Sequence, residues 1–192
     1  MGEKMYEDYL KVLRQRLDDY RYNHCLAVAE QAAYLAEKYG ADKETAFVAG
    51  LLHDITKNES YDWQLRFIKE CGIILDNDLK NSPKLLHAVS GALFIENNFN
   101  IENSEILNAV RYHTTGKENM TLLEKIVYIA DFTSADRVYP DVDVVRELAE
   151  KSLDGAILYA LSYTIKNLVD KQKPVHKDTL RAYNFLVDGG LK

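Results

Sequence analysis

Histidine and aspartate side chains end several apolar segments of this sequence. His53 and Asp54 follow the run Phe-Val-Ala-Gly-Leu-Leu, His87 follows two leucines, and Asp131 follows Ile-Val-Tyr-Ile-Ala. A carboxylate that is buried with such a segment is costly unless it gains a partner. Imidazoles and carboxylates that meet at one point suit a divalent transition metal such as Fe, Mn, Zn or Co better than Ca²⁺. We therefore predict a metal site formed by these segments.

Each of these residues has a simpler interpretation when it is taken alone. A His-Asp pair often arises by chance, and one histidine on an apolar helix face is more often a core residue than a ligand. Asp131 could instead pair with a buried arginine, such as Arg111 or Arg137. The metal interpretation is stronger for the whole set, because one cavity then accounts for several helical histidines and two acids. The histidines of the sequence are His24, His53, His87, His113 and His176.

Basic residues accompany the predicted ligands. Lys57 lies one helical turn after the His-Asp pair and therefore on nearly the same helix face. Arg21 lies one turn before His24, and Arg137 about two turns after Asp131. Taken singly, most such residues are solvated. Together they predict a ring of cations that binds phosphate beside the metal.

Two polar segments leave their role open. Thr114 begins the triplet Thr-Thr-Gly after His113, which either offers hydroxyl and N–H donors to a phosphate or forms the C-terminal turn of a helix. His176 follows Pro174 in a polar stretch. By its surroundings, His176 is predicted to be a surface-loop histidine.

The elements that must position these residues are predicted to be helices. The three prolines lie where helices begin or end, and few segments alternate with the period of a strand. Asp42, Ser60 and Ser82 are candidate N-caps, and Thr121 with Glu124 forms a capping box. The predicted helices span about 6–17, 22–38, 43–54, 61–71, 83–93, 104–112, 122–131, 142–169 with a break near 153, and 179–187.

Length and composition agree with one compact all-α domain over residues 1–192. The formal net charge of −6 argues against a partner nucleic acid, which needs a basic face. No signal peptide is evident, no stretch is apolar enough to span a membrane, and two cysteines do not make a disulfide scaffold. We therefore expect a cytoplasmic protein. The 13 tyrosines leave room for a homodimer face.

The order of these motifs resembles a known family. His24, then His53-Asp54, then Asp131 is similar to the H…HD…D pattern of HD-domain phosphohydrolases. The stretches Leu51-Leu-His-Asp-Ile-Thr-Lys57, Tyr112-His-Thr-Thr-Gly116 and Pro174-Val-His-Lys-Asp-Thr179 resemble the YqeK branch of that superfamily. The resemblance extends from about Arg21 to Asn184, which covers nearly the whole chain.

This resemblance implies an HD-domain helical bundle that cleaves dinucleoside tetraphosphates symmetrically, chiefly diadenosine tetraphosphate to two ADP. It implies a divalent transition metal, typically iron, held by His24, His53, Asp54 and Asp131. A second metal could lie near His87 and His113, or these histidines could bind phosphate or protonate the leaving ADP. The expected catalytic residues are Asp54, Lys57, His87, His113 and Arg137. The expected nucleotide contacts are Arg21, Lys57, His87, His113, Thr114, Arg137, Pro174, Val175, His176, Lys177, Asp178 and Thr179.

One segment departs from the family pattern. Related sequences usually read Tyr-Ile-Glu-Pro after the last aspartate ligand, whereas this chain reads Phe132-Thr-Ser-Ala-Asp136-Arg137. Arg137 keeps its place six residues beyond Asp131, whereas the residues expected to shape the pocket beside it differ from the family pattern. Two alternatives to the tetraphosphatase remain. One is an HD-type nucleotidase or phosphodiesterase that acts on another nucleotide, and the other is a non-catalytic sensor of metal or nucleotide.

Overall fold

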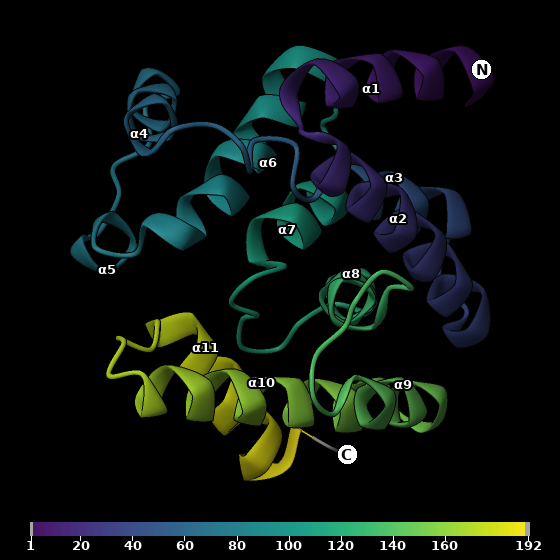
Figure 1. Cartoon of the computed structure of the whole chain (residues 1–192), viewed down its shortest axis with the longest axis vertical. Helices are drawn as coiled ribbons and strands as arrows, with labels where there is room; N and C mark the ends of the chain where they lie inside the picture. Colours follow the sequence, from purple (N-terminus) through teal and green to yellow (C-terminus); the bar gives the residue numbers. More distant parts are fainter. Residues whose placement is uncertain (1, 191–192) are drawn as a thin grey trace.

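The computed structural model describes residues 2–190 and the side chains of residues 6–189, and every regular element within them is helical. The predicted all-α fold is therefore confirmed. Figure 1 shows the helices in chain order. They are α1 (Gly2–Arg16), α2 (Asp19–Tyr39), α3 (Lys43–Leu52), α4 (Tyr61–Glu70), α5 (Asn77–Lys80), α6 (Leu86–Phe99), α7 (Ser104–Tyr112), α8 (Leu122–Thr133), α9 (Val142–Lys151), α10 (Leu153–Asp170) and α11 (Lys177–Phe185).

Side-chain caps set where several of these helices begin. Asp42 accepts a hydrogen bond from the backbone N–H of Thr45 at the start of α3, and Ser60 caps α4 in the same way. The predicted capping box of α8 is present, with Thr121 and Glu124 each accepting from the backbone N–H of the other. These caps satisfy N–H groups that the first turn of a helix leaves unpaired.

Two features differ from the sequence-based expectations, and a third agrees with them. Ser82 makes no side-chain cap, because the chain enters α6 through a 3₁₀ turn at Pro83–Leu85. The short helix α5 was not predicted, since a single turn is too short to show a helical period. The predicted break near 153 is present, where Ser152 ends α9 and caps α10.

Helix α8 lies at the centre of the bundle. Its residues Ile126 to Ala130 are completely buried, and it contacts α2, α3, α7, α9 and α10. In Figure 1, α9 and α10 run below α8, whereas α2 and α3 lie beside it. A stretch that is apolar on every side has to be enclosed by other helices. Asp131, which directly follows this stretch, is therefore held largely inside the protein, with a side chain only 15% exposed.

Helices α2 and α3 pack against each other unusually closely. A Cβ atom added at Gly50 of α3 would lie 3.0 Å from Ala29 Cα and 3.0 Å from the Val28 carbonyl oxygen, both in the backbone of α2. The missing side chain at Gly50 therefore permits this approach. It brings Val28 and Ala29 of α2 beside the C-terminal end of α3, with His24 one turn before Val28 and His53 directly after α3.

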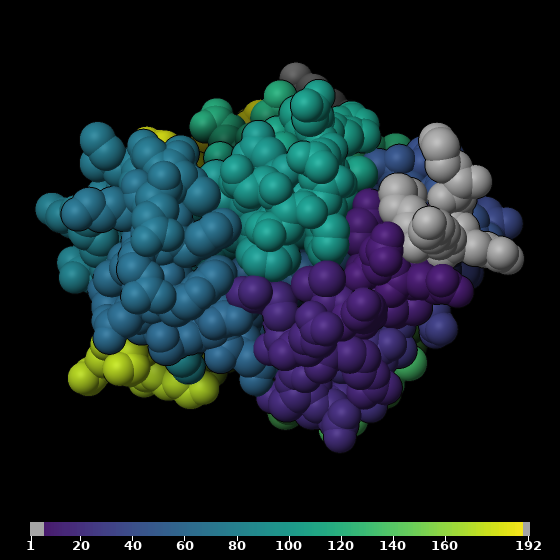
Figure 2. Space-filling view, turned by 90° about the horizontal axis from the view of Figure 1, so that it is seen from above, coloured from purple at the N-terminus to yellow at the C-terminus, as the bar shows by residue number. Residues whose placement is uncertain are grey.

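Helices α1, α4 and α6 cover one face of the molecule. Figure 2 shows this face, with α1 in purple, α4 in blue and the region of α6 in teal. A smaller cluster of buried apolar side chains packs α4 and α5 against α6. It consists of Ile68, Leu75, Leu79, Leu86 and Val89. None of the helices in the described residues is both long and apolar enough to cross a lipid bilayer.

Candidate metal centre

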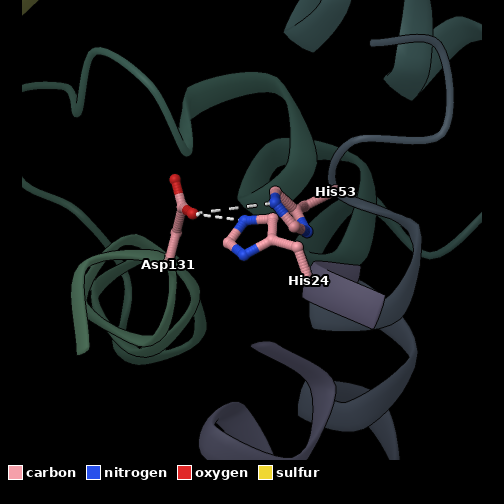
Figure 3. A group of neighbouring side chains, drawn as sticks. All are labelled: His24, His53 and Asp131. Atoms are coloured by element: carbon pink, nitrogen blue, oxygen red, sulfur yellow. Dashed lines mark hydrogen bonds and ion pairs between the residues drawn. The ribbon is translucent and has the colours of Figure 1, made fainter. Parts of the chain in front are cut away.

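Four polar side chains from three helices meet at one point. His24 projects from α2, His53 and Asp54 follow α3, and Asp131 projects from α8. The Nε2 atoms of His24 and His53 lie 3.0 Å and 3.8 Å from the same oxygen, Asp131 Oδ1 (Figure 3). His53 Nε2 also lies 3.4 Å from Asp54 Oδ2. These are the four residues expected to bind a metal.

A second group of side chains extends this cluster. His113 follows α7, and its Nε2 atom lies 3.4 Å from Asp54 Oδ1. His87, near the start of α6, places its Nε2 atom 3.0 Å from the same oxygen and 3.2 Å from His113 Nε2. Two sets of three ligand atoms, each within 4.8 Å of one another, can be drawn from the cluster, namely His24, His53 and Asp131, and His53, Asp54 and His113.

Backbone carbonyls fix two of the imidazole rings. His53 Nδ1 lies 2.7 Å from the Gly50 carbonyl oxygen, and His113 Nδ1 lies 2.7 Å from the Val110 carbonyl oxygen. A carbonyl only accepts hydrogen bonds, so each Nδ1 carries the hydrogen. Each Nε2 lone pair then points toward the cluster, as a metal ligand requires.

The donor set fits a divalent transition metal. His53 Nε2 is buried and has no hydrogen-bond partner among the residues that the structure describes. A buried polar nitrogen without a partner is costly, and a metal ion would satisfy it. Imidazole nitrogens together with carboxylate oxygens are the ligands that such ions prefer.

Both carboxylates of the centre are held in their ionised form. Burial by itself would raise the pKa of Asp54, but the surrounding imidazoles of His53, His113 and His87 outweigh it and keep that pKa well below its usual range. Burial likewise opposes ionisation of Asp131, but Arg137 and His24 together lower its pKa well below the usual range. The centre therefore offers two negative charges to a cation.

Two of the imidazoles are held in their neutral form. Burial lowers the pKa of His53, although Asp54 and Asp131 partly offset the effect. Burial also lowers the pKa of His87, to about 4. At neutral pH both rings are therefore uncharged and carry a lone pair that can bind a metal.

The three predicted cations border the centre. Arg21 Nη1 lies 2.6 Å from Asp54 Oδ2, and the guanidinium of Arg137 is hydrogen-bonded to the Asp131 carboxylate. Lys57 Nζ lies 3.0 Å from His87 Nε2. Asp131 thus pairs with Arg137 and not with Arg111, and it also lies within the histidine cluster. Asp131 is therefore both the partner of an arginine and a member of the proposed ligand set.

Residues 174–179, which are predicted to contact the nucleotide, form their own bonds outside the metal cluster. His176 is only 6% exposed, so its prediction as a surface-loop residue was wrong. Its Nδ1 accepts a hydrogen bond from the backbone N–H of Asp178 and so caps α11, which explains why α11 begins two residues earlier than predicted. Lys177 pairs with Asp76 next to α5. In the described chain, no hydrogen bond or ion pair of residues 174–179 reaches the metal cluster.

Thr114 also lies outside the hydrogen-bonded cluster. Its hydroxyl is buried and has no partner in the described part of the chain. Gly116, two residues later, has a φ of 65°, which ends the turn after α7. The structure thus shows the C-terminal turn of a helix, which was one of the two interpretations of this triplet. The unpaired Thr114 hydroxyl could still donate a hydrogen bond to a phosphate, which was the other interpretation.

Sequence reasoning missed one residue in contact with the cluster. Asp136 Oδ2 lies 2.7 Å from His24 Nδ1. The residue follows the end of α8 and belongs to the segment that departs from the family pattern. No periodicity or capping signal distinguishes it, since the contact joins residues 112 positions apart in the chain.

An all-helical bundle that gathers His, His-Asp and Asp from three helices is typical of HD-domain metal-dependent hydrolases. The HD domain family model matches residues 21–136. The chain is 38% identical to the symmetrical bis(5'-nucleosyl)-tetraphosphatase of Bacillus subtilis, over 95% of this chain and 98% of that protein. It is 38% identical to the protein of the same name from Halalkalibacterium halodurans, over 93% and 95%.

A solved structure agrees with these relatives. The crystal structure of a predicted HD superfamily hydrolase involved in NAD metabolism from Clostridium acetobutylicum matches with a TM-score of 0.94 and 35% identity. The match covers 95% of this chain and 97% of that chain. The chain therefore belongs to the symmetrical bis(5'-nucleosyl)-tetraphosphatase family of HD-domain hydrolases, and the resemblance seen in the sequence is confirmed. Membership of the HD family implies a divalent metal.

Proposed function

We propose that this protein is a metal-dependent hydrolase that cleaves dinucleoside tetraphosphates symmetrically, converting diadenosine tetraphosphate to two ADP. The observation that carries the proposal is the joint presence of ionised carboxylates, neutral imidazoles and three cations around one buried centre. A metal bound by the carboxylates and imidazoles would lie beside a polyphosphate bound by the cations. The matches to the relatives named for this reaction cover 95% and 93% of this chain.

His24, His53, Asp54 and Asp131 would hold the metal. Iron is the proposed ion, as the resemblance to the family implies, and its divalent form accepts a mixed set of imidazole and carboxylate ligands. His113, with His87 beside it, offers nitrogen ligands for a second ion that shares His53 and Asp54. A divalent metal at such a site polarises phosphoryl oxygens and lowers the pKa of water.

Arg21, Lys57 and Arg137 would bind the phosphates. Each lies within hydrogen-bonding or ion-pair distance of a proposed ligand, so an anion that contacts these side chains is held against the metal. Cations placed in this way stabilise the charge that develops on phosphoryl oxygens during transfer. The pKa of His87, about 4, favours binding of metal or phosphate over donation of a proton by this residue at neutral pH.

The test combines metal analysis with product analysis. Protein purified without a chelator should contain a divalent metal and should release two ADP from diadenosine tetraphosphate, measured by anion-exchange chromatography. Asp54→Asn should lose the metal and lower kcat by a factor on the order of 10³, because several kcal/mol of transition-state stabilisation depend on the ion. The matched control is Asp8→Asn, at an exposed position on α1.

Three results would contradict the proposal. One is release of AMP and ATP, which would show asymmetric cleavage. Another is faster turnover of deoxynucleotides, cyclic nucleotides or guanosine alarmones assayed in parallel. The third is full activity of the Asp54→Asn variant.

A further inference from the structure

His24 is held differently from His53 and His113. His53 and His113 each pair their Nδ1 with a carbonyl oxygen three residues earlier in the chain. Such a contact arises from the local path of the backbone. His24 Nδ1 instead lies 2.7 Å from the Asp136 carboxylate, which comes from the segment after α8. The orientation of this ring therefore depends on a remote residue.

Asp136 is itself held in place. The Ser134 hydroxyl donates to Asp136 Oδ1 at 2.7 Å, which leaves Oδ2 directed at His24. Arg146, on α9, donates to the carbonyl oxygens of Thr133, Ser134 and Arg137, at 3.1 Å, 2.9 Å and 3.2 Å. These bonds fix the backbone on both sides of Asp136. The carboxylate thus reaches His24 from a segment that α9 supports.

Packing alone does not explain this arrangement. The Asp136 side chain is 25% exposed, so it could be solvated without contacting His24, whereas the His24 ring is fully buried. A carboxylate that accepts a hydrogen bond from the Nδ1–H of a ligand imidazole fixes the ring and makes its Nε2 a stronger donor. His24 Nε2 lies on the Asp131 side of the ring, within 3.0 Å of that carboxylate.

We propose that Asp136 is a positioning residue for the metal ligand His24, and that Ser134 holds the Asp136 carboxylate in the orientation this requires. The proposal rests on the metal centre of the proposed function, but it does not depend on the identity of the substrate. Loss of such a partner typically weakens metal binding by a factor of about 10 to 100. The effect should appear in metal affinity before any substrate is added.

The experiment measures the dissociation constant of Co²⁺ for the full-length apoprotein by isothermal titration calorimetry. Asp136→Ala should weaken binding about 10- to 100-fold. Asp136→Asn should lie between this variant and the wild type, because its amide oxygen still accepts from Nδ1 but carries no charge. Asp8→Ala, at an exposed position on α1, is the matched control and should bind as the wild type does.

A double-mutant cycle tests the role of Ser134. Ser134→Ala alone should weaken Co²⁺ binding, but it should add little in the Asp136→Ala background, because the serine acts through that carboxylate. The visible absorption of bound Co²⁺ reports the ligands directly. Its band should change in Asp136→Ala and disappear in Asp54→Asn.

The outcomes separate this proposal from the proposed function. Wild-type affinity in Asp136→Ala, with binding abolished in Asp54→Asn, would overturn the role of Asp136 and leave the metal centre intact. Equal losses in Asp136→Asn and Asp136→Ala, accompanied by loss of helical circular dichroism, would assign Asp136 to folding and also overturn the proposal. A wild-type protein that binds no Co²⁺ would contradict both.

Discussion

Each carboxylate of the metal centre is matched to one arginine. Arg21 pairs with Asp54 and Arg137 pairs with Asp131, and imidazoles occupy the other sides of both acids. Without these partners a buried carboxylate would tend to bind a proton and lose its charge. Arg137 helps to keep Asp131 ionised, the surrounding imidazoles do so for Asp54, and both arginine side chains are suited to bind an incoming phosphate.

Lys57 is expected to act on the substrate and not on the metal. Its Nζ atom lies 3.6 Å from Asp54 Oδ1, and its side chain is about one-third exposed toward solvent. We expect Lys57→Ala to lower kcat/KM by a factor of about 10 to 100, equivalent to a charge-assisted hydrogen bond of about 1.5–3 kcal/mol, while the bound metal remains. Steady-state kinetics and metal analysis of the same sample measure both quantities.

The exposed Lys84 supplies the control for this prediction, and Lys84→Ala should leave both quantities unchanged. If Lys57→Ala loses its metal, Lys57 supports the ion, and its assignment to phosphate binding is wrong.

His176 makes the stability of α11 depend on pH. Burial lowers its pKa below the usual value, and the charges of Asp178 and Asp76 only partly offset this. In the unfolded chain the pKa is about 6.5. Between these two values the unfolded state binds a proton that the folded state does not, so the free energy of unfolding falls as the pH drops through this window. Protonation of Nδ1 would also remove the acceptor that caps α11.

We expect His176→Asn to weaken this pH dependence. Asparagine is a good N-cap and does not titrate, so the helix keeps its cap. The loss of stability between about pH 8 and about pH 5 should be smaller in the variant by roughly 1 kcal/mol, measured by urea denaturation. Identical pH dependence in the two proteins would show that His176 does not contribute.

At the scale of the helices, the site depends on how closely α2 and α3 approach. His24 lies on α2, and His53 ends α3, so the distance between the two helices sets the distance between the two ligands. Gly50 is the residue that permits the approach. Helix propensity alone would favour alanine at this position by up to about 1 kcal/mol, but the added methyl group has no space.

We therefore expect Gly50→Ala to destabilise the protein by about 1–3 kcal/mol and to weaken metal binding, since the contacting α2 atoms include backbone and cannot rotate away. Gly155→Ala on α10 is the matched control, because its added Cβ would meet only Ser152, at 3.5 Å. That variant should be as stable as the wild type or more so. Chemical denaturation and Co²⁺ titration of both variants measure the difference, and equal stabilities would show that α2 and α3 can separate without cost.

At the scale of the whole molecule, the centre connects helices that are distant in the sequence. Its side chains come from α2, from α6 and α8, and from the residues that follow α3 and α7. An ion bound by these side chains holds the helices together in the folded state and has no equivalent site in the unfolded chain. Metal binding should therefore stabilise the entire bundle.

Metal removal should lower the melting temperature. At a free metal concentration of about 100 times the dissociation constant, binding contributes about 2.7 kcal/mol. For a chain of this length the loss corresponds to roughly 5–10 °C. Differential scanning calorimetry with Mn²⁺ or with a chelator measures the change, and Asp54→Asn should melt at the same temperature under both conditions. A wild-type protein whose melting temperature ignores the chelator would contradict a metal that links these helices.

The sequence by itself determined the helical fold and the identity of the residues that gather at the centre. Apolar periodicity, caps such as Asp42 and Thr121, and the break at Ser152 are local signals, because a helix depends mainly on residues within four positions of each other. The types of His24, His53, Asp54 and Asp131 pointed to metal chemistry, because acids in apolar segments need partners. The short helix α5 and the 3₁₀ turn at Pro83 are too short to show a helical period in the sequence.

Only the tertiary structure decided how these residues face one another. Asp136 contacts His24, and Arg146 supports the segment that contains Asp136, although no pattern in the sequence relates these residues. The burial of His176 likewise depends on residues that are not its sequence neighbours. These contacts depend on how closely whole helices pack, which is set by the shapes of many side chains at once. The spacing of residues along the chain predicts where one helix forms, but it does not predict the distance between two packed helices.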